Sequence, residues 1–191
     1  MQPVGNKDKL GDWLHNCSID RVDFPVNPLH DFTYESRLGE WLTNAVTEIE
    51  MFEPYVFEQY APHLNLVHRA NMISFFSLVS ENTKCTLLKL VTKTAIPPWL
   101  KAEFKVYLPY SMFDVIVDPD LHDRRIKLST NVEIISGRGT DWFRFNHKTY
   151  YRMVRNPQTG QMEEEEKNPP FFDDERPTMA CVIDVVKKSS L

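Results

Sequence analysis

Four side chains that could bind a metal ion or transfer a proton lie within six residues, in the stretch DPDLHDRR. They are Asp118, Asp120, His122 and Asp123. A hard metal ion needs several oxygen ligands converging on one point. An EF-hand loop starting at Asp118 would have Gly at its sixth position and Glu at its twelfth, but Asp123 and Ser129 stand there. The pattern therefore favours a Pro-Asp turn between two strands, in which Asp side chains hydrogen-bond to local backbone.

A basic and aromatic stretch over residues 138–155 offers a different chemistry. Single-stranded nucleic acid is held by aromatic rings that stack on bases and by cations that contact phosphates. The candidate residues for binding nucleic acid or a protein partner are Arg138, Trp142, Arg144, Lys148, Tyr150, Arg152 and Arg155. Phe143 and Phe145 share one strand face, which is expected to be the core face. The alternative interpretation is an ordinary strand pair with a solvated basic side.

Motifs for several other chemistries are absent from the sequence. With six Gly residues in all, the chain contains no G-x-G-x-x-G or G-x-x-x-x-G-K-[ST] phosphate loop and no G-x-S-x-G nucleophile elbow. The three Cys residues are far apart and form no C-x-x-C pair, which argues against a zinc site and against a disulfide framework. We therefore expect no cofactor and no metal, and an intracellular protein of the cytoplasm or nucleus.

Charge is divided into blocks along the chain. Residues 84–155 carry thirteen Lys and Arg against seven Asp and Glu, whereas residues 156–177 carry two against seven. Such blocks indicate either complementary surfaces within one domain or a basic face that is open to a partner. No apolar run reaches the ~20 residues that a membrane helix needs, so no membrane contact is expected.

Hydrophobic periodicity predicts the helices that must position these residues. Apolar residues recur at three- and four-residue steps over residues 35–53, which predicts an amphipathic helix that ends at Pro54. Thr33 or Ser36 is the expected cap of its first turn. A second helix, largely buried and almost without charge, is expected over residues 63–79.

After Lys84 the hydrophobic period changes to two, which predicts strands. The strand candidates are residues 84–93, 101–110, 113–117 and 125–135, two strands around the NHK sequence at 146–148, and residues 178–187. SGRGTD, at residues 136–141, reads as a turn in which Gly137 and Gly139 are free to take positive φ.

The sequence therefore predicts an α+β fold, with an N-terminal helical pair packed on one face of an antiparallel sheet of about six or seven strands. Helices precede strands without βαβ alternation, which argues against a doubly wound fold. The predicted organisation is an extended arm at 1–34 and a single domain at 35–191, with helices at 35–80, sheet at 84–155 and 178–187, and an acidic Pro-rich loop at 156–177. That loop is expected to lack regular structure.

Phe171 and Phe172 are an apolar pair within the acidic loop, and they either dock a partner protein or anchor the loop on its own domain. The leading hypothesis is a non-catalytic interaction domain that acts as a subunit or adaptor of a larger intracellular assembly, with a protein partner. One rival is a single-stranded nucleic-acid-binding protein that uses the basic face of the sheet. Another is an enzyme with dispersed catalytic residues around Asp118–Asp123. The sequence does not indicate an oligomeric state.

Overall fold

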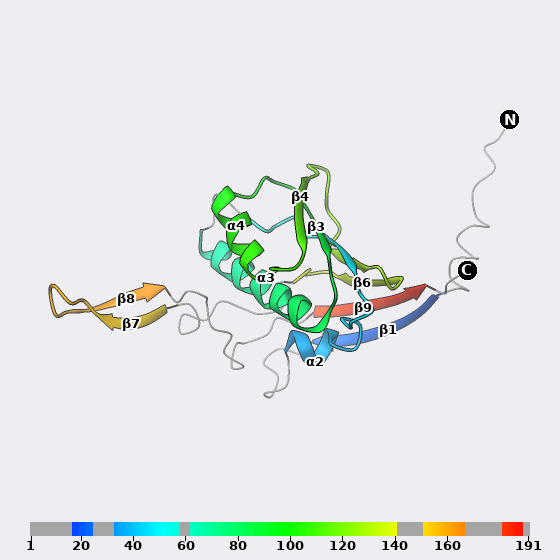
Figure 1. The fold of residues 1–191 in the computed structure, drawn as a ribbon, viewed down its shortest axis with the longest axis horizontal. Coiled ribbons are helices and arrows are strands. Elements are labelled where there is room, and N and C mark those ends of the chain that lie inside the picture. The colour runs from blue at the N-terminus through cyan, green and yellow to red at the C-terminus, as the bar shows by residue number, and fades with distance from the viewer. Residues whose placement is uncertain (1–16, 25–32, 58–61, 141–150, 167–180, 189–191) are drawn as a thin grey trace.

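The computed structural model describes residues 17–24, 33–57, 62–140, 151–166 and 181–188. They form a seven-stranded sheet in the order β1-β9-β6-β5-β2-β3-β4 and a separate two-stranded sheet, β7-β8 (Figure 1). The elements are β1 (Cys17–Phe24), α2 (Tyr34–Leu38), β2 (Glu48–Phe52), α3 (Pro62–Asn82), β3 (Leu87–Thr92), α4 (Pro98–Val106), β4 (Met112–Val117), β5 (Arg125–Leu128), β6 (Val132–Ser136), β7 (Tyr151–Arg155), β8 (Met162–Glu166) and β9 (Cys181–Lys188).

One half of the large sheet is parallel. β2 pairs with β3 and β3 pairs with β4 in parallel register, and α3 and α4 form the two connections between them. Parallel neighbours need such a crossover, because a tight turn can join only antiparallel strands. The predicted fold class, an N-terminal helical pair on one face of an antiparallel sheet, is therefore wrong. The sheet is mixed, and the helices alternate with strands along the chain.

The first predicted helix, over residues 35–53, is wrong over most of its length. α2 has five residues, and a reciprocal pair of bonds between Thr33 and Ser36 caps its start, at the expected position. The chain then turns and enters β2, where Ile49 and Met51 are buried and the glutamates beside them face the other way. The short period of two in EIEMF was hidden by the longer apolar spacing that precedes it.

The predicted strand over residues 101–110 is α4 instead. Leu100, Phe104 and Leu108 are buried, whereas Val106 is 71% exposed. Burial at a spacing of four is the pattern of a helix, so the alternation of apolar residues in this stretch was misleading. Pro98 starts the helix, at a position where the missing N–H of proline costs nothing.

The other half of the large sheet is antiparallel, and it continues from β2 through β5, β6 and β9 to β1. The single strand predicted over residues 125–135 is two strands, β5 and β6. Between them the N–H of Asn131 donates to the Leu128 carbonyl at 3.1 Å, and Asn131 takes a φ of 63°. Asn tolerates this conformation better than most residues, because its short side chain bonds locally.

The strand predicted near the C-terminal end is present as β9, with Ile183 and Val185 fully buried. It lies between β6 and β1, so it is an inner strand of the sheet. β1, which pairs with β9 along all eight of its residues, belongs to the stretch predicted to be an extended arm.

The core lies between the two longer helices and one face of the sheet. Figure 1 shows α3 and α4 on the same side of the large sheet. Phe76 of α3 meets Phe104 of α4 and Phe113 of β4 edge to face, with ring centroids 5.3 and 5.7 Å apart. Such aromatic pairs are favourable beyond the area they bury. This cluster fixes the helices on the parallel half of the sheet.

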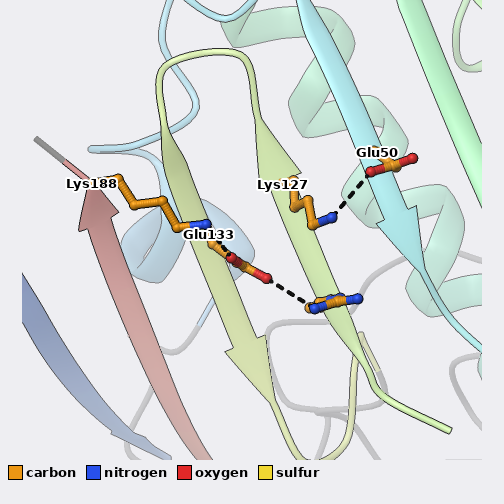
Figure 2. A network of polar contacts seen from close by, with 5 residues as sticks. Glu50, Lys127, Glu133 and Lys188 are labelled. Carbon is orange, nitrogen blue, oxygen red and sulfur yellow. Dashed lines mark hydrogen bonds and ion pairs between the residues drawn. The ribbon is translucent and has the colours of Figure 1, made fainter. Parts of the chain in front are cut away.

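The opposite face of the large sheet, which we call the open face, carries charged side chains. Lys127 of β5 lies 3.4 Å from Glu50 of β2, and Lys188 of β9 lies 3.0 Å from Glu133 of β6 (Figure 2). These pairs join neighbouring strands across the sheet. Opposite charges on adjacent strands stabilise a sheet modestly, by about 0.2–1 kcal/mol a pair.

β7 and β8 form a hairpin that extends away from the rest of the fold (Figure 1). Arg152 lies opposite Glu165, with a side-chain contact of 2.7 Å. Asn156 holds the turn, because its side-chain oxygen accepts from two backbone N–H groups and its amide donates to Glu163 at 2.8 Å. The prediction of an irregular loop over residues 156–177 is therefore wrong for β8, where the acidic run pairs directly with the preceding basic strand.

Candidate functional site

Several chain segments meet at one edge of the large sheet, which we call the carboxyl edge. β2, β3 and β4 end there with Phe52, Thr92 and Val117, and β6 ends there with Ser136. β5 runs the opposite way and starts there with Arg125, which is paired with Phe52. In open sheets with parallel strands, ligands bind outside the carboxyl ends of those strands, so this edge is the place to look for a site.

A pocket of about 560 Å³ opens at the carboxyl edge. Its lining comes from the segment after β2, the start of β5, and β6 with the turn that follows it. The lining residues are Tyr55, His122, Asp123, Arg124, Arg125, Glu133, Ile135, Ser136 and Gly137. We call this the carboxyl-edge pocket. It brings two guanidinium groups, an imidazole, two hydroxyls and two carboxylates to one concave surface.

Glu53 fixes one side of this pocket. Its side chain is buried, with 2% of the residue exposed. One carboxylate oxygen lies 3.2 Å from Nε of Arg124, and the other accepts from the backbone N–H of Thr140 at 3.2 Å. Arg124 also lies over the ring of Tyr55, 4.7 Å from its centroid. A buried carboxylate that lost this partner would be strongly unfavourable, so Glu53 and Arg124 hold each other in place.

The turn after β6 is shaped around the same carboxylate. Gly139 has a φ of +58°, and a Cβ atom built on it would lie 1.7 Å from Glu53 Oε2. Only glycine fits this position, because it tolerates the left-handed conformation and leaves room for the carboxylate. The hydroxyl of Tyr34 donates to the Thr140 carbonyl from the other side. The turn is therefore held rigidly at the edge of the pocket.

Arg125 is held more loosely than Arg124. Its guanidinium lies 4.6 Å from the centroid of Phe52, and Nη1 makes a long contact of 3.5 Å with Glu133. Glu133 also accepts from Lys188 at 3.0 Å. Nε of Arg125 is buried and has no hydrogen-bond partner within the described part of the chain. A guanidinium carries five N–H donors, so Arg125 retains most of its donor capacity on a wall of the pocket.

The four candidates around Asp118–Asp123 separate in the structure. The backbone N–H of Asp120 donates to the Asp118 side chain at 3.1 Å, within a turn closed by the Leu121 N–H. His122 and Asp123 instead line the carboxyl-edge pocket. Within the described residues, no three His, Cys, Asp or Glu side chains converge as a metal site would require.

Of the seven basic and aromatic candidates, the described structure contains Arg138, Arg152 and Arg155. Arg138 follows the pocket, and its N–H donates to Ser136 Oγ at 3.3 Å. Arg152 is paired with Glu165, and Arg155 donates to the Gly160 carbonyl at 3.0 Å. The remaining candidates, Trp142, Arg144, Lys148 and Tyr150, together with Phe171 and Phe172, lie outside the described residues. Nucleic-acid binding through this stretch stays a prediction.

Sequence reasoning missed most of the pocket. Glu53 and Tyr55 fell at the end of a predicted helix, and Arg124 and Arg125 fell next to a predicted turn. The turn after β6 was recognised, with Gly139 in the conformation it was expected to allow. The signal that could have found the pocket was the order β2-α3-β3-α4-β4, because it places the segments after β2 and β4 at one edge.

No helix in the described part of the chain is both long and apolar enough to cross a membrane. None of the curated proteins matches the chain. Residues 31–164, well over half of the chain, match the family described as a phospholipase D-like domain at the C-terminus of MIT. The matched range runs from α2 to the third residue of β8, and it therefore contains the whole carboxyl-edge pocket, whereas β1 and β9 lie outside it. By this match the chain belongs to the family of phospholipase D-like domains found at the C-terminus of MIT.

Proposed function

We propose that this protein acts as a non-catalytic interaction domain within a larger assembly, and that it binds a phosphate-bearing group of its partner in the carboxyl-edge pocket. The observation that carries the proposal is Arg125, whose buried Nε has no partner within the described residues while its guanidinium lines the pocket. The Arg125 side chain as a whole is 35% exposed, so a phosphate oxygen would accept from its remaining N–H groups, and charge-assisted bonds of this kind are about twice as strong as neutral ones.

The neighbouring side chains suit the same ligand. His122 lines the pocket beside Arg125, and its imidazole can donate one hydrogen bond to an anion. The flat guanidinium of arginine matches two oxygens of a phosphate at once. The family description supports a phosphate group as well, because a phospholipase D acts on a phosphate ester.

Binding without turnover is favoured by the state of the carboxylates. Glu53 is buried and paired with Arg124, and Glu133 is paired with both Arg125 and Lys188. A carboxylate acts as a general base only when it is free to take a proton from the reacting group, so neither glutamate is available for that role. Asp123, which is exposed at the rim, is the remaining carboxylate of the lining.

A protein partner is favoured over a lipid surface because of the overall charge. The chain has a formal net charge of −5, and an extended anionic membrane surface repels a negative protein more strongly than a peptide with a single phosphate does. Recognition would then depend on the local donors of the pocket and not on a broad positive field. The interaction partner is accordingly expected to present a phosphorylated side chain.

Isothermal titration with a blocked phosphoserine pentapeptide tests this proposal. We expect saturable binding that the unphosphorylated peptide does not show. Arg125→Gln should weaken it by roughly 10- to 100-fold, because hydrogen bonds to charged groups contribute about 1.5–3 kcal/mol. Lys127→Gln is the matched control: Lys127 lies two residues away on the same strand face but does not line the pocket.

Two outcomes would contradict the proposal. Equal binding of phosphorylated and unphosphorylated peptides would show that phosphate is not the ligand. Equal weakening by the two variants would show a general charge effect.

A parallel experiment uses vesicles with and without phosphatidic acid. Binding to the phosphatidic acid vesicles but not to the phosphopeptide would overturn the proposal that the partner is a protein.

A further inference from the structure

A second and larger cavity lies on the helical side of the molecule. It has a volume of about 830 Å³, and it is bounded by α3, α4 and the last residue of β8. Its lining includes Arg69, Trp99, Glu103, Val106, Tyr107 and Glu166. We call it the hairpin pocket. It shares no lining residue with the carboxyl-edge pocket.

The arginine of the hairpin pocket is already held by carboxylates through all three of its nitrogens. Nε and Nη2 of Arg69 both donate to Glu103 at 2.7 Å, and Nη1 donates to Glu166. Burial alone would lower the pKa of Arg69, but the hydrogen bonds to these two carboxylates outweigh it and raise the pKa. The guanidinium therefore stays charged, and each of its three nitrogens donates to a carboxylate. Two carboxylates against one cation leave the lining with an excess of negative charge.

The hairpin adds to this negative field. β8 contributes four consecutive glutamates, Glu163–Glu166, whereas β7 contributes only Arg152 and Arg155. Glu166 uses one oxygen for Arg69, and 41% of its side chain is exposed, so the carboxylate is accessible from solvent. A cationic group entering the pocket would be attracted by the two carboxylates that line it, Glu103 and Glu166.

Aromatic rings form the other walls. Trp99 is 56% exposed and is supported from below by an edge contact with Phe57, with centroids 6.5 Å apart. Tyr107 is half-buried, and its burial, followed by the charge of Glu103, raises its pKa. Aromatic faces attract ammonium and guanidinium groups, most strongly when the ring is that of Trp.

We propose that the hairpin pocket binds a cationic side chain, arginine or lysine, of an extended segment in a partner protein. The aliphatic stem would lie along Val106 and the Trp99 ring, and the charged head would reach the exposed carboxylate of Glu166. An apolar side chain would take the exposed part of the Glu166 carboxylate out of water without adding a partner, which is costly. A carboxylate or phosphate would be repelled by them. The site therefore differs in ligand sign from the carboxyl-edge pocket.

The test is an NMR titration of ¹⁵N-labelled protein with three blocked pentapeptides that differ only in the central residue: arginine, lysine or uncharged norleucine. The Trp99 indole N–H, assigned with a Trp99→Phe variant, and the Ala102 amide report on the pocket. We expect saturable shifts with the arginine and lysine peptides, reduced by added salt, and none with norleucine. Trp99→Ala should weaken binding by about three- to tenfold.

Two controls keep a negative result meaningful. Tyr110→Ala removes an aromatic residue that is 86% exposed on the loop after α4 but does not line the pocket, so it should leave the affinity unchanged. Arg125→Gln should also leave it unchanged, which separates this site from the proposed phosphate site. Equal shifts with norleucine would overturn the proposal, because the pocket would then be an apolar groove. Absence of saturable shifts with all three peptides would overturn it as well.

Discussion

The two pockets of this domain are each built around an arginine and glutamates, but they leave the arginine in different states. In the hairpin pocket, three nitrogens of Arg69 are bonded to Glu103 and Glu166. In the carboxyl-edge pocket, Arg125 has one long contact of 3.5 Å and a buried Nε without a partner in the described chain. Residue types alone would assign both pockets the same ligand. The two pockets differ in how many N–H donors of the arginine already have an acceptor within the protein.

The elements that carry the two arginines explain this difference. Arg69 lies on a helix, and Glu103 reaches it from the adjacent helix α4, so two rigid elements fix a bidentate pair. Arg125 begins a strand at the edge of the sheet, and its partner Glu133 must also serve Lys188. A shared acceptor leaves a donor unsatisfied. Unsatisfied donors at a sheet edge are available to a ligand, whereas the satisfied pair is structural.

The largest effect is expected from the buried pair beneath the carboxyl-edge pocket. Glu53→Gln should lower the free energy of unfolding by about 3–5 kcal/mol, because it leaves Arg124 without its charged partner in a largely buried position. Glu50→Gln is the control, since Glu50 is 39% exposed and its contact with Lys127 should contribute less than about 1 kcal/mol. Urea unfolding monitored by circular dichroism measures both. Similar losses for the two variants would show that Glu53 is not the structural anchor described.

The second largest effect is expected from replacing Arg69, compared with replacing Arg125. Arg69→Met should cost about 3 kcal/mol, because Glu103 is left with only 17% of its side chain exposed. Adding Glu103→Met should recover most of this loss, since an apolar pair can replace a buried ion pair. Arg125→Met should cost about 1 kcal/mol or less. Chemical denaturation gives the three values.

The hairpin offers an independent readout of the same comparison. Glu166 ties β8 to Arg69, and Tyr151 packs beside Val67 and Ala70 of α3. Hydrogen exchange in β7 should therefore accelerate in Arg69→Met and stay unchanged in Arg125→Met. Acceleration in both variants, or in neither, would contradict the assignment of Arg69 as the anchor of the hairpin.

The smallest effect is expected in the two glycine turns, the one after β6 and the one between β7 and β8. Gly139 and Gly160 both have positive φ, but a Cβ atom would overlap Glu53 at the first and meet nothing within 4 Å at the second. Gly160→Ala should cost about 1 kcal/mol from backbone strain alone. Gly139→Ala should cost about 2 kcal/mol or more, because the turn or the carboxylate must also shift. Thermal unfolding of the two variants tests this; equal losses would mean that the turn adapts freely.

The sequence predicts the parts of this fold in which one period dominates. The buried helix over residues 63–79, the strand at 113–117 and the last strand all lie where periodicity places them. Prediction from the sequence fails where a helical and a strand-like hydrophobic period overlap. In residues 101–110, Phe104 and Leu108 fit a strand as well as a helix, and only the exposure of Val106 distinguishes them. In residues 35–53, a helix-like spacing runs into a short strand.

The candidate site was beyond prediction for a different reason. Glu53 contacts Arg124 and Thr140, which are 71 and 87 residues further along the chain. No local pattern records that these residues meet. Their proximity follows from β2 pairing with β5 on one side and β3 on the other, a choice made by the whole sheet. Once that strand order is known, the carboxyl edge is the expected position for a site.

The insertion of β9 between β6 and β1 has a consequence for folding. Cys17 pairs with Lys188 and Phe24 with Cys181, so β1 has no neighbour in the sheet until residues 181–188 have been synthesised. Contacts between residues so distant in the chain form slowly, because the entropy cost of closing a long loop comes before the favourable contact energy. During synthesis, the edge of β6 would stay open while the α3–α4 core could already assemble. Completion of the sheet is therefore expected to be a late step, separated in time from formation of the parallel half.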